Sequence, residues 1–300
     1  MKNSFLAILL LTIITSCQDK FNTKEEIRLE CQQGTEPVRK VLFIGIDGVR
    51  TDALLAANTP CIDTLMQHAY YNLHTDRGPF TVSVPGWSSI LHGVWPAKHG
   101  LTKNAFDGNN YENYPDIFAL ARESKPNLSL VSLSNWSDFL RITTKENYSQ
   151  RYDSDHEMKE AAKMLLQSCT PDMMVLHFDA PDAFGHDSGF TPTNKAYLDA
   201  IQLVDMHIQQ LMDIVKSRES QFNEEWMVVL STDHGGNGTG HGGQDDLDET
   251  RFVWCILRQP QLSAPVILST ANSVDLLPSM LKWMNIEINP NWDLDGVPLY

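Results

Sequence analysis

The stretch VLFIGIDG, residues 41–48, is an apolar run of buried-strand length that ends in an aspartate and a glycine. Two later runs have the same form. MMVLHF at 173–178 leads into acidic residues, and WMVVLS at 226–231 leads into Thr232, Asp233 and His234. Short continuous apolar runs of this kind are typical of strands that are buried on both faces. The three runs therefore predict the centre of a parallel sheet.

Helical patterns lie between and around these strands. The clearest runs from about Pro192 to Ser217, where apolar residues recur at spacings of three and four and form one core-facing stripe. The other predicted elements are helices at 59–69, 114–123, 155–168 and 274–284 and a strand at 128–133. We expect Ser273 to cap the last helix. Strands that alternate with helices predict an α/β fold, with a mostly parallel central sheet and helices on both faces.

The N-terminal residues predict an exported protein. Lys2 is followed by an apolar run at 5–14, which is too short to span a membrane comfortably, so we interpret residues 1–16 as a secretory signal peptide. The sequence ITSC, which ends at Cys17, resembles the lipobox of bacterial lipoproteins. We therefore expect Cys17 to carry lipid that tethers the protein to a bacterial membrane, on its periplasmic or cell-surface side. An ordinary cleaved signal peptide is the alternative.

The charge balance excludes several classes of partner. The chain has 23 basic and 38 acidic side chains. Without residues 1–16, which contain only Lys2 of these, 22 basic side chains face 38 acidic ones, a net charge of −16. Such a chain has no basic surface for a nucleic-acid duplex or for anionic lipid headgroups. If it binds phosphates, cations must supply the positive charge.

The rest of the chain divides simply. Residues 17–38 are polar and lack apolar periodicity, which predicts a flexible tether. Residues 39–300 are long enough to form one large catalytic domain. The cysteines beyond Cys17 fit no zinc-finger spacing, although an exported location permits disulfides, and their pairing stays open. These cysteines are Cys31, Cys61, Cys169 and Cys255. The oligomeric state is not predicted.

Carboxylate and imidazole side chains gather where the predicted strands end. In open α/β sheets, functional groups collect beyond the carboxyl ends of the strands. Three aspartates and three histidines mix in a way that suits zinc, and six ligands suit two ions better than one. The six are Asp47, Asp182, His186, Asp233, His234 and His241. Asp179 follows a predicted strand as well.

The segment STDHGGNGTGHGG, residues 231–243, also admits a second interpretation. Gly238-x-Gly240-x-x-Gly243 formally fits a dinucleotide-binding loop, in which a helix opens directly onto the phosphates. The residues that follow, QDDLDET, are acidic and carry no apolar helical stripe. A pyrophosphate would meet like charge there, so we favour metal ligands on a backbone that glycines allow to bend tightly.

A nucleophile is expected in the segment 80–100, which offers the hydroxyls of Thr81, Ser83, Ser88 and Ser89. Spacing alone does not choose among them. Ser83 stands before a Pro-Gly pair where a helix could begin, and a helix N-terminus stabilises both an alkoxide and a phosphate.

Taken in order, these motifs resemble the alkaline phosphatase superfamily, most closely its nucleotide pyrophosphatase/phosphodiesterase branch. The resemblance runs from about residue 41 to residue 257. In that family the nucleophile lies two residues before a proline, ten before a glycine and twenty-one before an asparagine, which Ser83, Pro85, Gly93 and Asn104 match. The family's other ligand motifs match IGIDGVR, DAPDAFGH, DHG and HG, at 44–50, 179–186, 233–235 and 241–242.

The resemblance implies an alkaline-phosphatase-like three-layer sandwich and the roles of the site residues. One zinc ion would be held by Asp182, His186 and His241. The other would be held by Asp47, Asp233 and His234, with Ser83 bridging or approaching it. Asn104 would help to bind the phosphoryl oxygens.

The implied activity is metal-dependent hydrolysis of phosphate esters through a phosphoseryl intermediate, most closely that of a phosphodiesterase or nucleotide pyrophosphatase acting on a small phosphate ester or nucleotide. The alternatives are a monoesterase, a phosphonate or sulfate ester hydrolase, and a non-catalytic ligand-binding lipoprotein. Trp87 stands where the sulfatase signature has an arginine, which argues against a sulfatase. The neutral Asn104 suits the single negative charge of a diester.

A few residues outside the motif carry weaker expectations. Trp87 and Trp136 are interpreted as core residues, with stacking on a base as the alternative, and Arg50 as structural. The remaining histidines are interpreted as ordinary core or surface residues: His68, His74, His92, His99, His156, His177 and His207.

Overall fold

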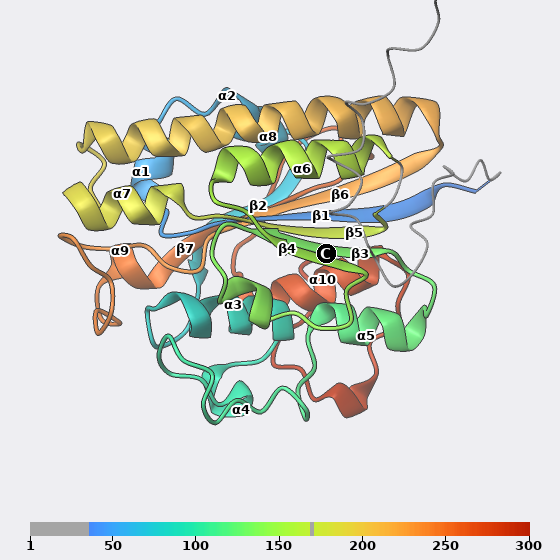
Figure 1. Ribbon diagram of the computed structural model, residues 1–300, viewed down its shortest axis with the longest axis horizontal. Coiled ribbons are helices and arrows are strands. Elements are labelled where there is room, and N and C mark those ends of the chain that lie inside the picture. The colour runs from blue at the N-terminus through green and yellow to red at the C-terminus, as the bar shows by residue number, and fades with distance from the viewer. Residues whose placement is uncertain (1–35, 169–170) are drawn as a thin grey trace, which may run out of the picture.

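The computed structural model describes residues 36–168 and 171–300. A central sheet lies between two layers of helices (Figure 1). The predicted three-layer α/β sandwich with a mostly parallel sheet is therefore confirmed. The predicted signal peptide and most of the tether lie outside the described residues, as do Cys17, Cys31 and Cys169. No helix in the described ranges is long and apolar enough to cross a membrane.

The sheet has eight strands in the order β4-β3-β5-β1-β6-β7-β2-β8. All neighbouring strands are parallel except β7, which runs antiparallel to both β6 and β2. The strands are β1 (Val38–Ile46), β2 (Ala69–Asp76), β3 (Leu130–Ser134), β4 (Tyr148–Arg151), β5 (Met173–Phe178), β6 (Glu224–Ser231), β7 (Phe252–Arg258) and β8 (Val266–Ile267).

Two sets of helices cover the two faces of this sheet (Figure 1). One face carries α1 (Thr51–Ala56), α2 (Pro60–Met66), α6 (Asp155–Gln167), α7 (Ala180–Ser188) and the long α8 (Lys195–Gln221). The other carries α3 (Ser83–His92), α4 (Pro96–His99), α5 (Ile117–Ser124) and α10 (Leu276–Trp283). The short α9 (Asp248–Arg251) precedes β7. Within residues 36–168 and 171–300, three 3-10 turns complete the fold: η2 (Phe139–Arg141), η3 (Ser273–Asp275) and η4 (Pro290–Trp292).

The central strand β1 separates two hydrophobic cores. Val41 and Phe43 belong to the core beneath α3, α5 and α10, whereas Leu42 and Ile44 belong to the core beneath α8. All four side chains are fully buried. Successive side chains of a strand point to opposite faces, so one continuous apolar run fills both cores. The sheet is thereby fixed as the rigid centre from which the loops of the site project.

Several predicted elements are confirmed and others need correction. The strand at 173–178 is found with the predicted bounds, and the long helix is displaced by a few residues. The helix predicted at 59–69 ends at Met66, because Ala69 already begins β2. Ser273 does not cap the last helix. Instead, Asn272 and Asp275 form a capping box around η3, from which α10 continues.

Strands β2 and β7 were not predicted. β2 contains Asn72, His74 and Thr75 among its apolar residues, and its register against β7 shifts between Asn72 and Thr75. This irregularity weakens the alternation from which a strand is recognised. Segment 252–258 forms β7, and no ligand motif at its Arg258 end marks it as a strand in the sequence.

Candidate active site

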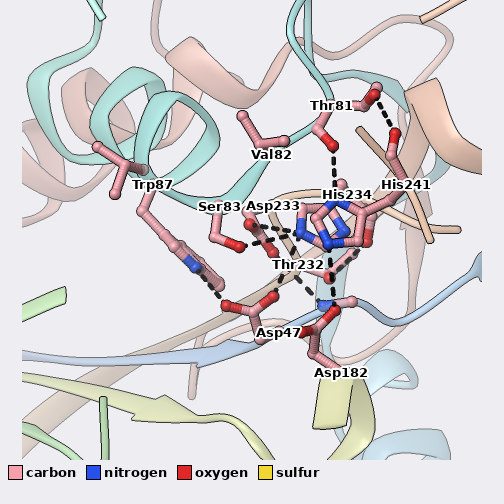
Figure 2. Close-up of polar contacts among 12 residues, drawn as sticks. Asp47, Thr81, Val82, Ser83, Trp87, Asp182, Thr232, Asp233, His234 and His241 are labelled. Atoms are coloured by element: carbon pink, nitrogen blue, oxygen red, sulfur yellow. Dashed lines mark hydrogen bonds and ion pairs between the residues drawn. The ribbon is translucent and has the colours of Figure 1, made fainter. Parts of the chain in front are cut away.

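The ends of the central strands bring the predicted aspartates together. Gly45 of β1 is paired with Ser231 of β6, so Asp47 and Asp233 leave the sheet at the same level, two residues further on. Both carboxylates are buried. They lie close together with Ser83, Asp182, His234 and His241 at this edge of the sheet (Figure 2).

One group of candidate metal ligands consists of Asp182, His186 and His241. Asp182 and His186 are four residues apart on α7, so they lie about one helical turn from each other. The His186 Nε2 atom lies 3.3 Å from Asp182 Oδ2 and 3.0 Å from His241 Nε2. The His241 Nε2 atom lies 3.7 Å from Asp182 Oδ1. We call these residues the helix group.

The second group consists of Asp47, Asp233 and His234. The His234 Nε2 atom lies 3.4 Å from Asp47 Oδ1 and 3.3 Å from Asp233 Oδ2. We call these residues the strand group, because all three directly follow β1 or β6. The two groups adjoin through the rings of His234 and His241, which stack with centroids 3.7 Å apart. The structure thus assembles all six predicted ligands into two adjacent groups.

The oxygen atoms of these groups lack the partners that a buried carboxylate requires. One oxygen of each aspartate, namely Asp47 Oδ1, Asp182 Oδ1 and Asp233 Oδ2, is buried without a hydrogen bond. A buried acceptor left unpaired costs about 1–3 kcal/mol, and more when it is charged. Cations bound at the two groups would satisfy these atoms: Asp182 Oδ1 in the helix group, and Asp47 Oδ1 and Asp233 Oδ2 in the strand group.

The histidine nitrogen atoms point to the same conclusion. The Nδ1 atoms of His186, His234 and His241 contact the backbone carbonyl oxygens of Thr239, Gly235 and Thr81, at 2.9, 2.7 and 2.6 Å. A carbonyl oxygen only accepts, so each Nδ1 carries the hydrogen, and each Nε2 can present a lone pair to the site once it is unprotonated. Histidine ligands of metals are oriented in this way. The donor set therefore fits a metal ion.

Burial and neighbouring charges shift the pKa values of the candidate ligands in opposite directions. Burial and the nearby charge of Asp47 raise the pKa of Asp233 well above its usual value. Burial also opposes the charge on Asp47, but the hydrogen bond from His177 and the nearby His234 outweigh it and lower the Asp47 pKa. In the helix group, the hydrogen bond to Asp182 raises the pKa of His186 to about 9. Metal binding to His186 would therefore displace a proton.

Asp47 is held by two residues whose role the sequence did not reveal. The Asp47 Oδ2 atom accepts hydrogen bonds from His177 Nε2 at 2.8 Å and from Trp87 Nε1 at 3.0 Å, which leaves Oδ1 free to face the site. Trp87 is fully buried, which agrees with its interpretation as a core residue. For His177, the available signal was an imidazole in an otherwise apolar strand, because a fully buried polar group must have a partner.

Ser83 is the hydroxyl that reaches the ligands. It is the first residue of α3, and its Oγ atom lies 3.2 Å from His234 Nε2. Ser88 and Ser89 are turned to other partners: Ser88 Oγ donates to Val84 O, and Ser89 Oγ contacts His99 Nε2. The helix predicted to begin at Ser83 is confirmed.

Asn104 is brought to the same helix end. Its Oδ1 atom accepts a hydrogen bond from the backbone nitrogen of Val84 at 2.9 Å. This bond fixes the side chain beside Ser83 and leaves the amide nitrogen of Asn104, an exposed residue, available as a donor.

Glycines allow the backbone segments of the site to approach closely. A Cβ atom on Gly235 would lie 1.9 Å from the carbonyl oxygen of Glu249, and one on Gly86 would lie 2.9 Å from Asp233 Cβ. The dinucleotide interpretation of the glycine-rich segment is wrong, because turns rather than a helix follow Gly243.

Two arginines near the site bind backbone. The Nε atom of the buried Arg77 donates to the carbonyl oxygen of Asp233 at 2.7 Å, and its Nη1 atom donates to that of Pro79 at 3.0 Å. Arg50 donates from Nη1 to the carbonyl oxygens of Phe190 and Gly236. Its predicted structural role agrees with these bonds, whereas Arg77 was not singled out from the sequence.

Comparison with known proteins gives a family match. The family model "Type I phosphodiesterase / nucleotide pyrophosphatase" matches residues 41–250. Among curated proteins, GPI ethanolamine phosphate transferase 3 of Schizosaccharomyces pombe is 23% identical over 80% of this chain and 28% of its own length. Human bis(5'-adenosyl)-triphosphatase ENPP4 is 22% identical over 65% of this chain and 47% of its own length. The chain thus spans less than half the length of these two relatives.

Solved structures support the fold. Murine ectonucleotide pyrophosphatase/phosphodiesterase 5, an inactive variant in complex with AMP, superposes with a TM-score of 0.68 at 14% identity, covering 84% of this chain and 96% of its own. The 2-O GAG sulfatase BT1596 superposes with a TM-score of 0.67 at 16% identity, covering 88% and 73%. At such identities the likeness concerns the fold alone.

Proposed function

The chain belongs to the type I phosphodiesterase/nucleotide pyrophosphatase family, and from this premise we propose that it is an exported zinc-dependent phosphodiesterase or nucleotide pyrophosphatase. Its substrate would be a small phosphate diester or a nucleotide. One observation carries the proposal: three orphaned carboxylate oxygens and three Nε2 lone pairs converge on the space beside the Ser83 hydroxyl.

Two zinc ions are the cofactors that suit this donor set. The helix group would hold one ion and the strand group the other, with Ser83 bridging or approaching the second. Imidazole and carboxylate donors together favour zinc over magnesium or calcium, which prefer oxygen ligands alone. When bound, the ions supply positive charge that stabilises an alkoxide at Ser83 and the phosphoryl oxygens.

Ser83, Asn104 and the N-terminus of α3 would then have separate roles in the reaction. Ser83 Oγ gives its proton to solvent and attacks phosphorus, the bond from phosphorus to the leaving oxygen breaks, that oxygen takes up a proton from solvent, and a phosphoseryl enzyme results. Water then attacks the same phosphorus and releases Ser83. The amide nitrogen of Asn104 donates to a phosphoryl oxygen, and the N-terminus of α3 adds its partial positive charge.

A diester suits the groups around phosphorus better than a monoester. A monoester carries more negative charge and calls for an additional cationic group near the phosphoryl oxygens. Asn104 is neutral, and the bonds of Arg77 to Asp233 and Pro79 go to backbone carbonyl oxygens. A sulfatase is disfavoured because Trp87, which stands in place of that signature's arginine, donates to Asp47 instead.

The test compares thymidine 5'-p-nitrophenyl phosphate with p-nitrophenyl phosphate at matched pH and zinc concentration. We expect a higher kcat/KM for the diester, and loss of activity with both substrates after metal removal by a chelator. A clear preference for the monoester would contradict the diester assignment. Activity that a strong chelator leaves unchanged would contradict the metal-dependent mechanism.

Attachment to a membrane through lipid on Cys17 is a further part of the proposal. It is supported by the ITSC sequence after the apolar run. In a bacterial host, the full chain should incorporate labelled palmitate and fractionate with membranes, whereas the Cys17→Ala variant should do neither. Equal labelling of both proteins would contradict the proposal. The proposal includes neither binding to a nucleic-acid duplex nor binding to membranes through a basic protein surface.

A further inference from the structure

Thr81, one of the four hydroxyl residues considered for the nucleophile, contacts the loop that carries His241. Thr81 lies two residues before Ser83 in the sequence, and its side chain is fully buried. Its Oγ1 hydroxyl donates to the backbone oxygen of His241 at 2.5 Å, and its own carbonyl oxygen accepts from His241 Nδ1 at 2.6 Å (Figure 2). Its backbone nitrogen donates to Asp245 Oδ1 at 2.8 Å. We call these three hydrogen bonds the Thr81 clasp.

The clasp holds a loop that has little packing of its own. Cβ atoms built on Gly240 and Gly243 would meet nothing within 4 Å, and one built on Gly242 would meet Val82 Cγ1 alone, at 3.3 Å. Glycine also has the largest backbone freedom to lose when it is ordered. The position of His241 therefore depends on bonds from outside the loop. The clasp provides bonds at the backbone oxygen and at the ring of this residue.

The clasp also connects the two parts of the site. His241 presents Nε2 to Asp182 and His186 of the helix group. Ser83, two residues after Thr81, contacts His234 of the strand group. Thr81 thus joins the chain segment that carries the hydroxyl to the segment that carries a ligand 160 residues away.

We propose that Thr81 is a positioning residue that aims His241 Nε2 at the metal site through its hydroxyl. This inference rests on the proposed function, because it takes His241 to be a metal ligand. Loss of the hydroxyl should weaken the ion held by the helix group and spare the ion held by the strand group, whose ligands directly follow β1 and β6. A residue that only stabilises the fold would not separate the two ions.

The experiment measures zinc affinity on the full chain by competition with a chromophoric chelator. Thr81→Val removes the hydroxyl at nearly constant shape, and Thr81→Ser restores it. Thr75→Val is the matched control, because Thr75 is equally buried and its hydroxyl bonds Asn72 instead. In Thr81→Val we expect one ion to bind roughly ten- to a hundredfold more weakly, as for other residues that orient metal ligands.

Three further results are expected. In Thr81→Val, the affinity for the other ion should stay within about threefold of the wild-type affinity. Thr81→Ser and Thr75→Val should keep the affinities for both ions within the same range. Excess zinc should restore the kcat of Thr81→Val. Unchanged affinities in folded Thr81→Val would overturn the inference. So would an equal loss at both ions that Thr75→Val reproduces, because that result is expected of a purely structural residue.

A second pair of variants keeps the test decisive if Thr81→Val does not fold. Asp245→Ala removes the acceptor of the Thr81 backbone nitrogen, whereas Asp245→Asn keeps an acceptor oxygen at that position. We expect Asp245→Ala to weaken the same single ion by a few-fold, roughly the effect of one lost hydrogen bond, and Asp245→Asn to restore it. Equal affinities in both variants and wild type would count against the clasp. A wild-type protein that binds no zinc would contradict the proposed function itself.

Discussion

The strand group and the helix group use the same kinds of side chain but differ in their supports. Asp47 and His234 of the strand group are 1% and 0% exposed, and they directly follow β1 and β6. In the helix group, His186 is 46% exposed on α7, and His241 lies in the glycine-rich loop. One half of the site is therefore built on the most rigid part of the sheet. The other half depends on a short helix and on a loop that must be held from outside.

This difference indicates that the two ligand groups have different roles in the site. The hydroxyl of Ser83, the proposed nucleophile, contacts His234 of the buried strand group, and a nucleophile must be placed precisely. In the helix group, by contrast, the side chain of His186 is in contact with solvent. Substitutions should therefore affect the two groups unequally, and the following predictions run from the largest expected effect to the smallest.

Ser83→Ala should have the largest effect, a loss of kcat of at least about a thousandfold, because it removes the attacking atom. Zinc content should stay near that of wild type, since the six remaining ligands are intact. Steady-state kinetics and elemental analysis of the same preparation check both statements. Near-normal turnover in Ser83→Ala, with loss in Ser88→Ala or Ser89→Ala, would move the nucleophile to another residue.

The paired variants His234→Ala and His186→Ala compare the two groups directly. We expect each to weaken its own ion more than about a hundredfold, since a lost ligand costs more than a lost supporting residue. Only His234→Ala should also lower the melting temperature in the absence of zinc, because it leaves a cavity in a fully buried position. Chelator titration and thermal unfolding provide the two readouts. Equal loss of stability in both variants would remove the distinction between the groups.

Asn104→Ala should reduce kcat/KM by roughly ten- to a thousandfold, the order expected for one hydrogen bond to the transition state. Zinc affinity should be unchanged, because Asn104 belongs to neither group. Asn109→Ala is a suitable control, since the Asn109 side chain bonds Phe106 away from Ser83. An Asn104→Ala enzyme with full activity toward the diester would contradict the assigned role.

His177→Phe should weaken the ion of the strand group by about ten- to a hundredfold, the range found for residues that orient metal ligands. The ring volume is kept, and the hydrogen bonds of the ring to Asp47 and to Ser134 Oγ are lost. His92→Phe provides the control, because His92 is equally buried but bonds the carbonyl oxygens of Tyr114 and Ile142. Weakening confined to the helix group would show that His177 acts elsewhere.

The parts of the molecule that could be predicted are those determined by the pattern of apolar and polar residues within a short segment. Apolar runs revealed β1, β5 and β6, and the aspartates that follow β1 and β6 revealed half of the site. The order of the motifs, through the family resemblance, identified Ser83, Asn104 and His241 as site residues. The structure places Ser83 and Asn104 at the N-terminal end of α3 and His241 in the helix group.

The remainder depended on tertiary contacts that leave no local pattern. His177 meets Asp47 across 130 residues, and Arg77 reaches the backbone of Asp233 across 156. Thr81 was weighed as one hydroxyl among four, and only the folded chain shows that it holds His241. No helix was expected at Ala180–Ser188, where Pro181 lies in the first turn of α7 and the His186 side chain reaches Asp182 one turn earlier.

The central claim is that this chain is a two-zinc phosphodiesterase, and a reconstitution titration tests it most directly. The protein is stripped of metal with a chelator and titrated with zinc while hydrolysis of thymidine 5'-p-nitrophenyl phosphate is followed. We predict no activity without metal, and activity that rises until two equivalents of zinc are bound per chain. Full activity in the stripped protein, or saturation at one equivalent, would contradict the account.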